Sequence, residues 1–249
     1  MEGRKGNDTA GRGEVRLLLI SSSFHGDGGY LDHCASDIRA FLAGIGRVLF
    51  VPFALKDWDW YSALARGRFL EMGHALDAIH EVRTPREAIA SAEAIFVGGG
   101  NTYRLLNTLY RLEILRCLES RVRDGVPFIG ASAGANIACP TIKTSNDMAI
   151  VYPPCPTALG VIPFQINPHY YDPDPACEAR VETRERRIRE YHEENEWPVL
   201  GLREGERLRL DGSELVLVGK SPARLFQRGS EPREIEPGAS LSFLLDPSS

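Results

Sequence analysis

The segment VPFIGASAGANIA, residues 126–138, decides how this 249-residue chain folds. It begins with a short, continuous apolar run, which is typical of a parallel strand buried on both faces. The run passes directly through Gly130-Ala131-Ser132-Ala133-Gly134 into a short helical pattern. A GxSxG motif between a strand and a helix indicates a nucleophilic serine on a tight, strained turn. The alternative is a plain strand–turn–helix unit packed closely by small residues.

Outward from this segment, apolar strand patterns alternate with helical patterns. The upstream strand patterns are VRLLLI (15–20), RVLFVPF (47–53) and AIFVGGGN (94–101). The helical patterns cover residues 31–45, 58–73, 84–92 and 102–125, the last in one or two pieces, whereas residues 75–82 are ambiguous. This alternation predicts an α/β fold, with a mostly parallel sheet and helices on both faces.

The C-terminal third of the chain has a different pattern. RLRLDGSELVLVG (207–219) predicts a hairpin around Asp211-Gly212, and ASLSFLL (239–245) predicts a last strand, so we expect antiparallel strands near the C-terminus. The Gly- and charge-rich residues 1–13 are expected to form a flexible tail. Residues 14–249 then form a single α/β domain.

Composition limits the classes of function. Lys and Arg number 29 and Asp and Glu 34, and the net charge of −5 argues against a nucleic-acid or anionic-membrane partner. No apolar run approaches the ~20 residues of a membrane span, and the polar N-terminus does not resemble a secretion signal, so we expect a cytoplasmic protein. The five cysteines form no CxxC pair and lack metal-ligand spacing, so we expect free thiols in a reducing compartment.

The second candidate motif is Gly98-Gly99-Gly100-Asn101, at the end of a strand pattern. Ligands of parallel sheets lie outside the carboxyl ends of the strands, which places this motif near Ser132. We therefore expect an oxyanion hole formed by the backbone N–H of Gly99 or Gly100 together with that of Ala133. We assign Asn101 to substrate binding. The alternatives are an anion cradle that binds a nucleotide or another small molecule, and a flexible turn.

A nucleophilic serine needs a base, and His169 is the first candidate. It follows the apolar run GVIPFQIN (160–167), and Pro168 keeps the preceding residue extended, so the histidine is expected at the mouth of a strand or loop. His25, at the end of the first strand pattern, is a rival base. Two carboxylates remain open as the group that orients the imidazole: Asp147, and Glu204 at the end of another strand pattern.

The segment from Glu178 to Glu193 predicts a strongly charged helix. Val181, Ile188 and Tyr191 fall on one face at helical spacing, and Arg184 falls on that same face. Because an unpaired buried charge is costly, we expect Arg184 either to form an internal salt bridge or to bind a substrate carboxylate through two hydrogen bonds of its guanidinium.

Four segments, in order, resemble the S51 serine peptidases, the peptidase E or α-aspartyl dipeptidase family. They are GGGNTYRLL (98–106), GASAGANIACPTIKTSNDM (130–148), QINPHY (165–170) and ETRERRIRE (182–190). The resemblance runs from about Val15 to the C-terminus. It implies an α/β fold akin to class I glutamine amidotransferase domains, a flavodoxin-like arrangement. It also implies a serine dipeptidase, with no metal and no cofactor, that takes a small acidic dipeptide with an N-terminal aspartate.

Carried over by motif, the resemblance implies that Ser132 is the nucleophile, that His169 is the base and that Arg184 binds the acidic side chain of the substrate. The third catalytic member is implied at either Asp147 or Glu204. The chain departs from the family at Ala131, where relatives have a bulky residue, and over residues 170–183. We therefore keep two alternatives, a relative acting on isoaspartyl or cyanophycin-type peptides and a non-enzymatic binding protein. We expect a monomer or homodimer.

Overall fold

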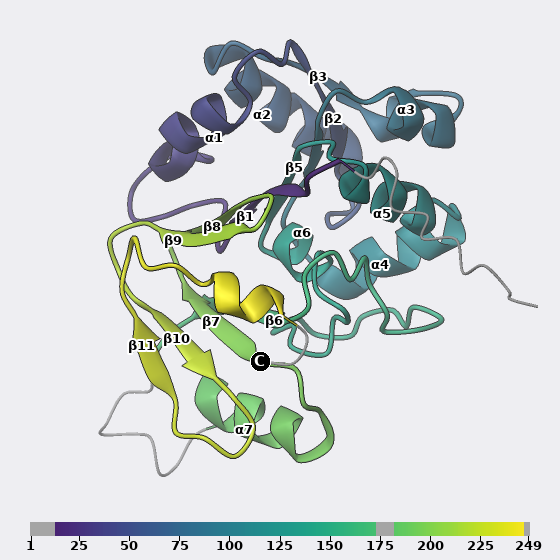
Figure 1. Ribbon diagram of the computed structural model, residues 1–249. Helices are drawn as coiled ribbons and strands as arrows, with labels where there is room; N and C mark the ends of the chain where they lie inside the picture. Colours follow the sequence, from purple (N-terminus) through teal and green to yellow (C-terminus); the bar gives the residue numbers. More distant parts are fainter. Residues whose placement is uncertain (1–12, 173–181, 247–249) are drawn as a thin grey trace, which may run out of the picture.

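The computed structural model describes residues 13–172 and 182–246 (Figure 1). Its main sheet has seven strands in the order β3-β2-β4-β5-β1-β8-β9. The first five of these are parallel, and β8 and β9 are antiparallel to their neighbours. The strands are β1 (Arg16–Ile20), β2 (Arg47–Val51), β3 (Ala75–Ala78), β4 (Ile95–Val97), β5 (Phe128–Ala131), β8 (Arg207–Asp211) and β9 (Glu214–Val218). The predicted α/β fold, mostly parallel sheet and C-terminal antiparallel strands are confirmed.

Helices cover both faces of this sheet, as the sequence predicts. On one face lie α1 (Ala35–Phe41), preceded by the 3-10 turn η1 (Asp32–Cys34), and α2 (Trp58–Glu71). On the other lie α3 (Pro85–Ser91), α4 (Thr102–Arg111), α5 (Leu115–Arg123) and the short α6 (Ala133–Asn136). Alternate residues of β1 serve the two cores: Leu17 and Leu19 face α3–α6, whereas Leu18 and Ile20 face α1 and α2. The ambiguous segment 75–82 forms β3 and the 3-10 turn η2 (Ile79–Glu81).

A second sheet, not predicted from the sequence, lies beside the first in the order β11-β10-β7-β6 (Figure 1). Its strands are β6 (Gln165–Tyr170), β7 (Val199–Arg203), β10 (Ala223–Phe226) and β11 (Arg233–Ile235). Strands β6 and β7 are parallel, and β10 and β11 complete the sheet antiparallel to their neighbours. Helix α7 (Arg184–Glu194) packs on this sheet through Ile188 and Tyr191. Sheet and helix together carry several of the candidate site residues.

Two boundary predictions are wrong. Segment 239–245 is no strand: Ser240 forms a single bridge to Val216, and Ser242–Leu245 is the 3-10 turn η3. Leu241 and Leu244 are both buried, and their spacing of three suits one face of a turn rather than one face of a strand. Helix α7 begins at Arg184 instead of Glu178, because the Thr183 side chain accepts from the Arg186 N–H and caps the helix.

Several predicted features lie outside the described residues. These are the tail, apart from Gly13, and Val181 on the predicted helix face. Within residues 13–172 and 182–246, no helix has both the length and the apolar character that crossing a bilayer requires.

Candidate active site

Ser132 occupies a strained turn between β5 and α6. Its φ of 52° and ψ of −107° lie in a region that L-residues rarely adopt. Two sets of backbone hydrogen bonds hold this conformation: the Ser132 N–H donates to the Ile20 carbonyl at 2.8 Å, and the Ser132 carbonyl accepts from the first turn of α6. A Cβ on Gly130 would collide with the Gly134 backbone, and one on Gly134 with the Val97 carbonyl. The small residues of the GxSxG motif are therefore a steric requirement of the turn.

His169 and Glu204 complete a hydrogen-bonded series with this serine. The Ser132 Oγ lies 2.8 Å from His169 Nε2, and His169 Nδ1 lies 2.7 Å from Glu204 Oε1. With the carboxylate ionised, Nδ1–H donates to Glu204 and Nε2 accepts from the serine hydroxyl, the arrangement of a nucleophile, its base and an orienting group. His169 also has a positive φ, of 53°, at the irregularity where β6 shifts register against β7. This distortion lies at the residue whose ring reaches the serine.

Asp147, the other carboxylate left open by the sequence, lies elsewhere. It accepts hydrogen bonds from the Thr102 N–H at 2.7 Å and from the Thr102 hydroxyl at 2.6 Å. The Asn101 side chain caps the same helix by accepting from the Arg104 N–H, and it donates to the Met148 carbonyl. Asp147 and Asn101 thus fix the start of α4 and the loop beside it. The carboxylate that contacts His169 is Glu204.

Ser21 is a site residue that sequence analysis missed. It is fully buried at the end of β1, where its Oγ accepts from the His169 N–H at 2.9 Å and donates to the Leu202 carbonyl at 2.7 Å. These bonds fix the distorted part of β6 against β7, two residues before Glu204. The three serines after β1 are a visible signal, but the partners of Ser21 lie 148 and 181 residues away.

The GGGN loop lies directly against the serine. A Cβ on Gly99 would lie 3.2 Å from the Ala131 carbonyl oxygen and from the Ser132 Cβ, a tighter contact than most side chains make, so glycine favours this approach. Burial raises the pKa of Tyr61, while the Tyr30 hydroxyl and the Gly99 N–H beside it lower that pKa. Gly99 thus lies beside Tyr61 as well as beside Ser132. Within the described residues, the N–H groups of Gly100 and Ala133 have no hydrogen-bond partner and remain available to an oxyanion.

Two cavities flank the His169–Glu204 pair. The first, of about 370 Å³, is lined by Ser132, Gly99 and Gly100 and by aromatic and aliphatic side chains. The second, of about 620 Å³, is lined by Arg184, Arg203, Tyr171 and Asp172. Among the residues that the structure describes, His169 and Glu204 line both cavities. Ser132 thus lines the first cavity and Arg184, the candidate carboxylate-binding residue, lines the second, and the two cavities share His169 and Glu204.

Arg184 is the first residue of α7 and borders the second cavity. Its guanidinium lies 5.2 Å from the centre of the Tyr171 ring, and its buried Nε has no hydrogen-bond partner. Burial lowers the pKa of Arg184. No carboxylate of residues 13–172 or 182–246 forms an ion pair with it, so the internal salt bridge that the sequence allowed is not observed there. The guanidinium is therefore free to bind an anionic ligand.

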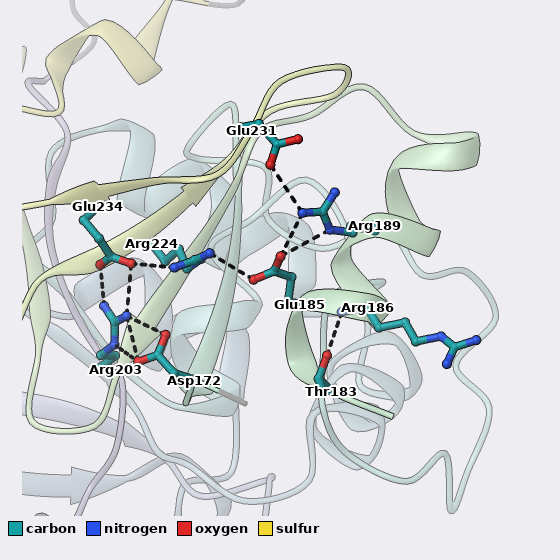
Figure 2. A network of polar contacts seen from close by, with 9 residues as sticks. All are labelled: Asp172, Thr183, Glu185, Arg186, Arg189, Arg203, Arg224, Glu231 and Glu234. Atoms are coloured by element: carbon teal, nitrogen blue, oxygen red, sulfur yellow. Dashed lines mark hydrogen bonds and ion pairs between the residues drawn. The ribbon is translucent and has the colours of Figure 1, made fainter. Parts of the chain in front are cut away.

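Two other arginines beside this cavity and helix, Arg203 and Arg224, form ion pairs with carboxylates (Figure 2). Arg203 binds Asp172 through two nitrogens and also binds Glu234, and Arg224 joins Glu234 to Glu185. This network ties the end of β6, strands β7, β10 and β11, and helix α7 together. Because Arg203 precedes Glu204 and Glu185 follows Arg184, the network fixes the backbone beside both functional side chains.

His25, the rival base, lines the first cavity without contacting Ser132 through a hydrogen bond. Its ring packs against Gly205, where a Cβ would fall 2.9 Å from it, and lies 5.7 Å from the ring of His33. The histidine that forms a hydrogen bond with Ser132 is His169. Within the described ranges, no cluster of three His, Cys, Asp or Glu side chains could hold a metal ion.

Comparison with known proteins gives consistent matches. The sequence model of Peptidase family S51 matches residues 17–218. A Streptomyces coelicolor protein named "Peptidase E" is 50% identical over 232 residues, which are 93% of this chain and 96% of that protein. A Drosophila melanogaster "Probable alpha-aspartyl dipeptidase" is 42% identical over 232 residues, 92% of this chain and 96% of that one. The crystal structure of a peptidase from an acI-B1 Actinobacterium shares the fold, with a TM-score of 0.66 at 17% identity over 92% of this chain and 97% of the other.

Proposed function

The chain belongs to peptidase family S51, a family of serine hydrolases, and we propose that it cleaves dipeptides with an N-terminal aspartate through Ser132, His169 and Glu204. The observation that carries this proposal is the uninterrupted hydrogen-bonded series from the Ser132 hydroxyl through the His169 ring to Glu204. A strained nucleophile in contact with an oriented base is the arrangement that acyl transfer to serine requires.

In the first half of the reaction, Ser132 Oγ attacks the peptide carbonyl carbon while His169 Nε2 takes the hydroxyl proton. Glu204 stabilises the imidazolium that forms. The carbonyl oxygen becomes negative and accepts hydrogen bonds from the N–H groups of Gly100 and Ala133. Removal of one such donor typically costs ~10²–10³ in rate. The C–N bond then breaks, His169 gives its proton to the leaving amine, and an aspartyl ester of Ser132 remains.

In the second half, water takes the place of the amine. His169 Nε2 accepts a proton from the water as its oxygen attacks the ester carbonyl, and then returns a proton to Ser132 Oγ as the ester bond breaks. The products are free aspartate and the second amino acid. The serine and the neutral imidazole are restored.

Arg184 supplies the selectivity for an acidic first residue. A protein with a net charge of −5 repels acidic ligands at long range, so binding an aspartate side chain requires a local cation. Arg184 is such a cation, beside the base and without an ion-pair partner among the described residues. Its planar guanidinium fits a carboxylate with two parallel hydrogen bonds.

The test is hydrolysis of a panel of α- and β-aspartyl dipeptides by the wild-type enzyme and by Ser132→Ala, with a chelator present. We expect the wild type to cleave α-Asp-Xaa and Ser132→Ala to be inactive with an unchanged unfolding temperature. Retained activity in Ser132→Ala would contradict the nucleophile assignment. Preference for β-aspartyl substrates would instead indicate an isoaspartyl or cyanophycin-type specificity.

We further place the enzyme in the cytoplasm, as a monomer or homodimer. Four cysteines among the described residues, Cys34, Cys117, Cys139 and Cys155, are free thiols, which is in keeping with a reducing compartment. Cell fractionation would test the compartment, and light scattering would give the mass of the particle in solution.

A further inference from the structure

The first cavity has a wall that the reaction itself does not require. Aromatic and aliphatic side chains surround the space next to Ser132, chiefly Phe24, Tyr30, Leu55, Trp60, Tyr61 and Leu64. The aromatic rings form a connected set: Phe24 lies 5.5 Å from Tyr30, Tyr30 lies 6.0 Å from Tyr61, and Trp60 stacks on Tyr61 at 6.4 Å. We call this group the aromatic wall.

Two of its members are unusually accessible for such large apolar groups. Trp60 is 57% exposed and Phe24 is 53% exposed, although each borders a cavity. Exposed aromatic surface around a concave site marks a place where a ligand can bury apolar area. Burial of a Leu or Phe side chain against such a wall is favourable because apolar surface is removed from water.

The charge of the cavity also indicates an apolar ligand group. Among the described residues that line it, none is Arg or Lys, and the fixed negative charge is that of Glu204. His25 and His169 are its other titratable groups apart from two tyrosines, whose pKa values are raised by burial. An acidic side chain here would face Glu204 without a compensating cation. A charged side chain of either sign would also lose hydration against the aromatic wall.

The position of the cavity relative to Arg184 shows which part of the substrate it would receive. Resting on the function proposed above, the aspartyl side chain extends to Arg184, which lines the second cavity. The scissile carbonyl lies at Ser132, so the leaving residue extends away from Arg184, into the first cavity. We infer that the aromatic wall binds the side chain of the residue after aspartate and selects dipeptides in which that residue is large and apolar or aromatic.

The experiment measures kcat/KM for Asp-Phe, Asp-Leu, Asp-Gly and Asp-Asp. We expect Asp-Phe and Asp-Leu to exceed Asp-Gly by about tenfold or more, the usual discrimination of a hydrophobic pocket for added apolar groups. Asp-Asp is expected to be the poorest substrate. Equal values for Asp-Phe and Asp-Gly would overturn the inference and leave the proposed function standing, whereas no cleavage of any Asp-Xaa would overturn both.

A variant pair locates the effect. Trp60→Ala removes an exposed part of the aromatic wall from α2, and Leu70→Ala is its matched control on the same helix, 71% exposed and outside the cavity. We expect Trp60→Ala to lower the Asp-Phe to Asp-Gly ratio of kcat/KM by about tenfold and Leu70→Ala to leave that ratio unchanged. An unchanged ratio in Trp60→Ala, with the unfolding temperature retained, would remove the wall as the cause.

A binding measurement separates selectivity from catalysis. Calorimetric titration of Ser132→Ala with Asp-Phe and Asp-Gly gives dissociation constants without turnover. We expect Asp-Phe to bind at least about five times more tightly, because the apolar contact exists before the chemical step. Equal dissociation constants together with equal turnover would show that the wall contacts no part of the substrate.

Discussion

Replacement of Glu204 by glutamine tests which carboxylate serves His169. Glutamine keeps the length of the side chain and an oxygen that can accept from Nδ1–H, so the substitution chiefly removes the negative charge. Asp147→Asn is the matched control, because Asp147 bonds Thr102 and Ser145 instead of the imidazole. The structure therefore predicts a larger loss of activity for Glu204→Gln than for Asp147→Asn, although both substitutions remove one negative charge.

The size of the effect follows from distance and exposure. The carboxylate and imidazolium charges lie about 4 Å apart across the 2.7 Å bond, which gives about 1–4 kcal/mol at effective dielectric constants of about 80 down to about 20. Because the Glu204 side chain is 55% exposed and that of His169 is 39% exposed, solvent screens the pair, and we take its interaction energy as about 1–2 kcal/mol. The expected loss in kcat is then about 5- to 30-fold, far below the ~10⁴ seen for a buried triad carboxylate.

The assay is kcat on a saturating Asp-Leu substrate at neutral pH, at low and at high salt. Glu204→Gln should lose about 5- to 30-fold, and the wild-type advantage should shrink as added salt screens the exposed pair. Asp147→Asn should change kcat by less, since it disturbs the start of α4 rather than the base. A larger kcat loss in Asp147→Asn than in Glu204→Gln would refute the assignment.

Three further substitutions test two other residues of the site and one buried histidine outside it. Ser21→Ala leaves the His169 N–H without its partner. We therefore expect the free energy of unfolding to fall by about 1–3 kcal/mol and kcat to fall at an unchanged KM. The control is Ser62→Ala, which removes a buried hydroxyl without a partner and should change neither the free energy of unfolding nor kcat. Arg184→Met should lower kcat/KM for Asp-Leu by about 10- to 100-fold and affect Asn-Leu less, and equal losses would make the arginine structural. Burial and, to a smaller extent, the charge of Arg207 lower the pKa of His33, so the unfolded state binds the proton more readily than the folded state. The stability that the neutral histidine allows above pH ~6.5 is therefore lost as the pH falls. His33→Phe should flatten the decline of the unfolding temperature from pH 7 to 5, and an unchanged slope would contradict this.

Four strands of the parallel sheet, β1, β2, β4 and β5, can be predicted because they are buried on both faces, whereas the partly exposed β3 stays ambiguous in the sequence. Double burial leaves a continuous apolar run such as VRLLLI, and the helices between the runs keep their own period. The hairpin of β8 and β9 was equally predictable, since Gly212 has a φ of 60° at its turn. These elements are determined by local sequence, so apolar periodicity and turn residues are enough to predict them.

The second sheet could not be predicted in this way. Strand β6 contains Pro168 and the positive-φ residue His169, and both interrupt a strand pattern. Its parallel partner β7 lies beyond helix α7 in the sequence, and β10 and β11 are only four and three residues long. The pairing of such strands depends on long-range register, which apolar periodicity does not encode.

The same distinction applies to the site. Ser132 was predicted because a local steric requirement, the tight turn, shapes its neighbours. The choice between Asp147 and Glu204 was left open because it depends on the register of β6 against β7, which places Glu204 within 2.7 Å of the His169 ring. Ser21 was missed for the same reason, since its partners come from the second sheet.

The end of β1 explains how two strained residues are held in contact without a substrate. Two consecutive residues anchor both: the Ile20 carbonyl accepts from the Ser132 N–H, and the Ser21 hydroxyl accepts from the His169 N–H. The first anchor is backbone and survives any substitution that keeps the strand, whereas the second depends on one hydroxyl. Loss of that hydroxyl should therefore release the base while the nucleophile keeps its turn. The contact between Ser132 and His169, the proposed nucleophile and base, then depends on the Ser21 side chain, which takes no part in the proposed chemistry.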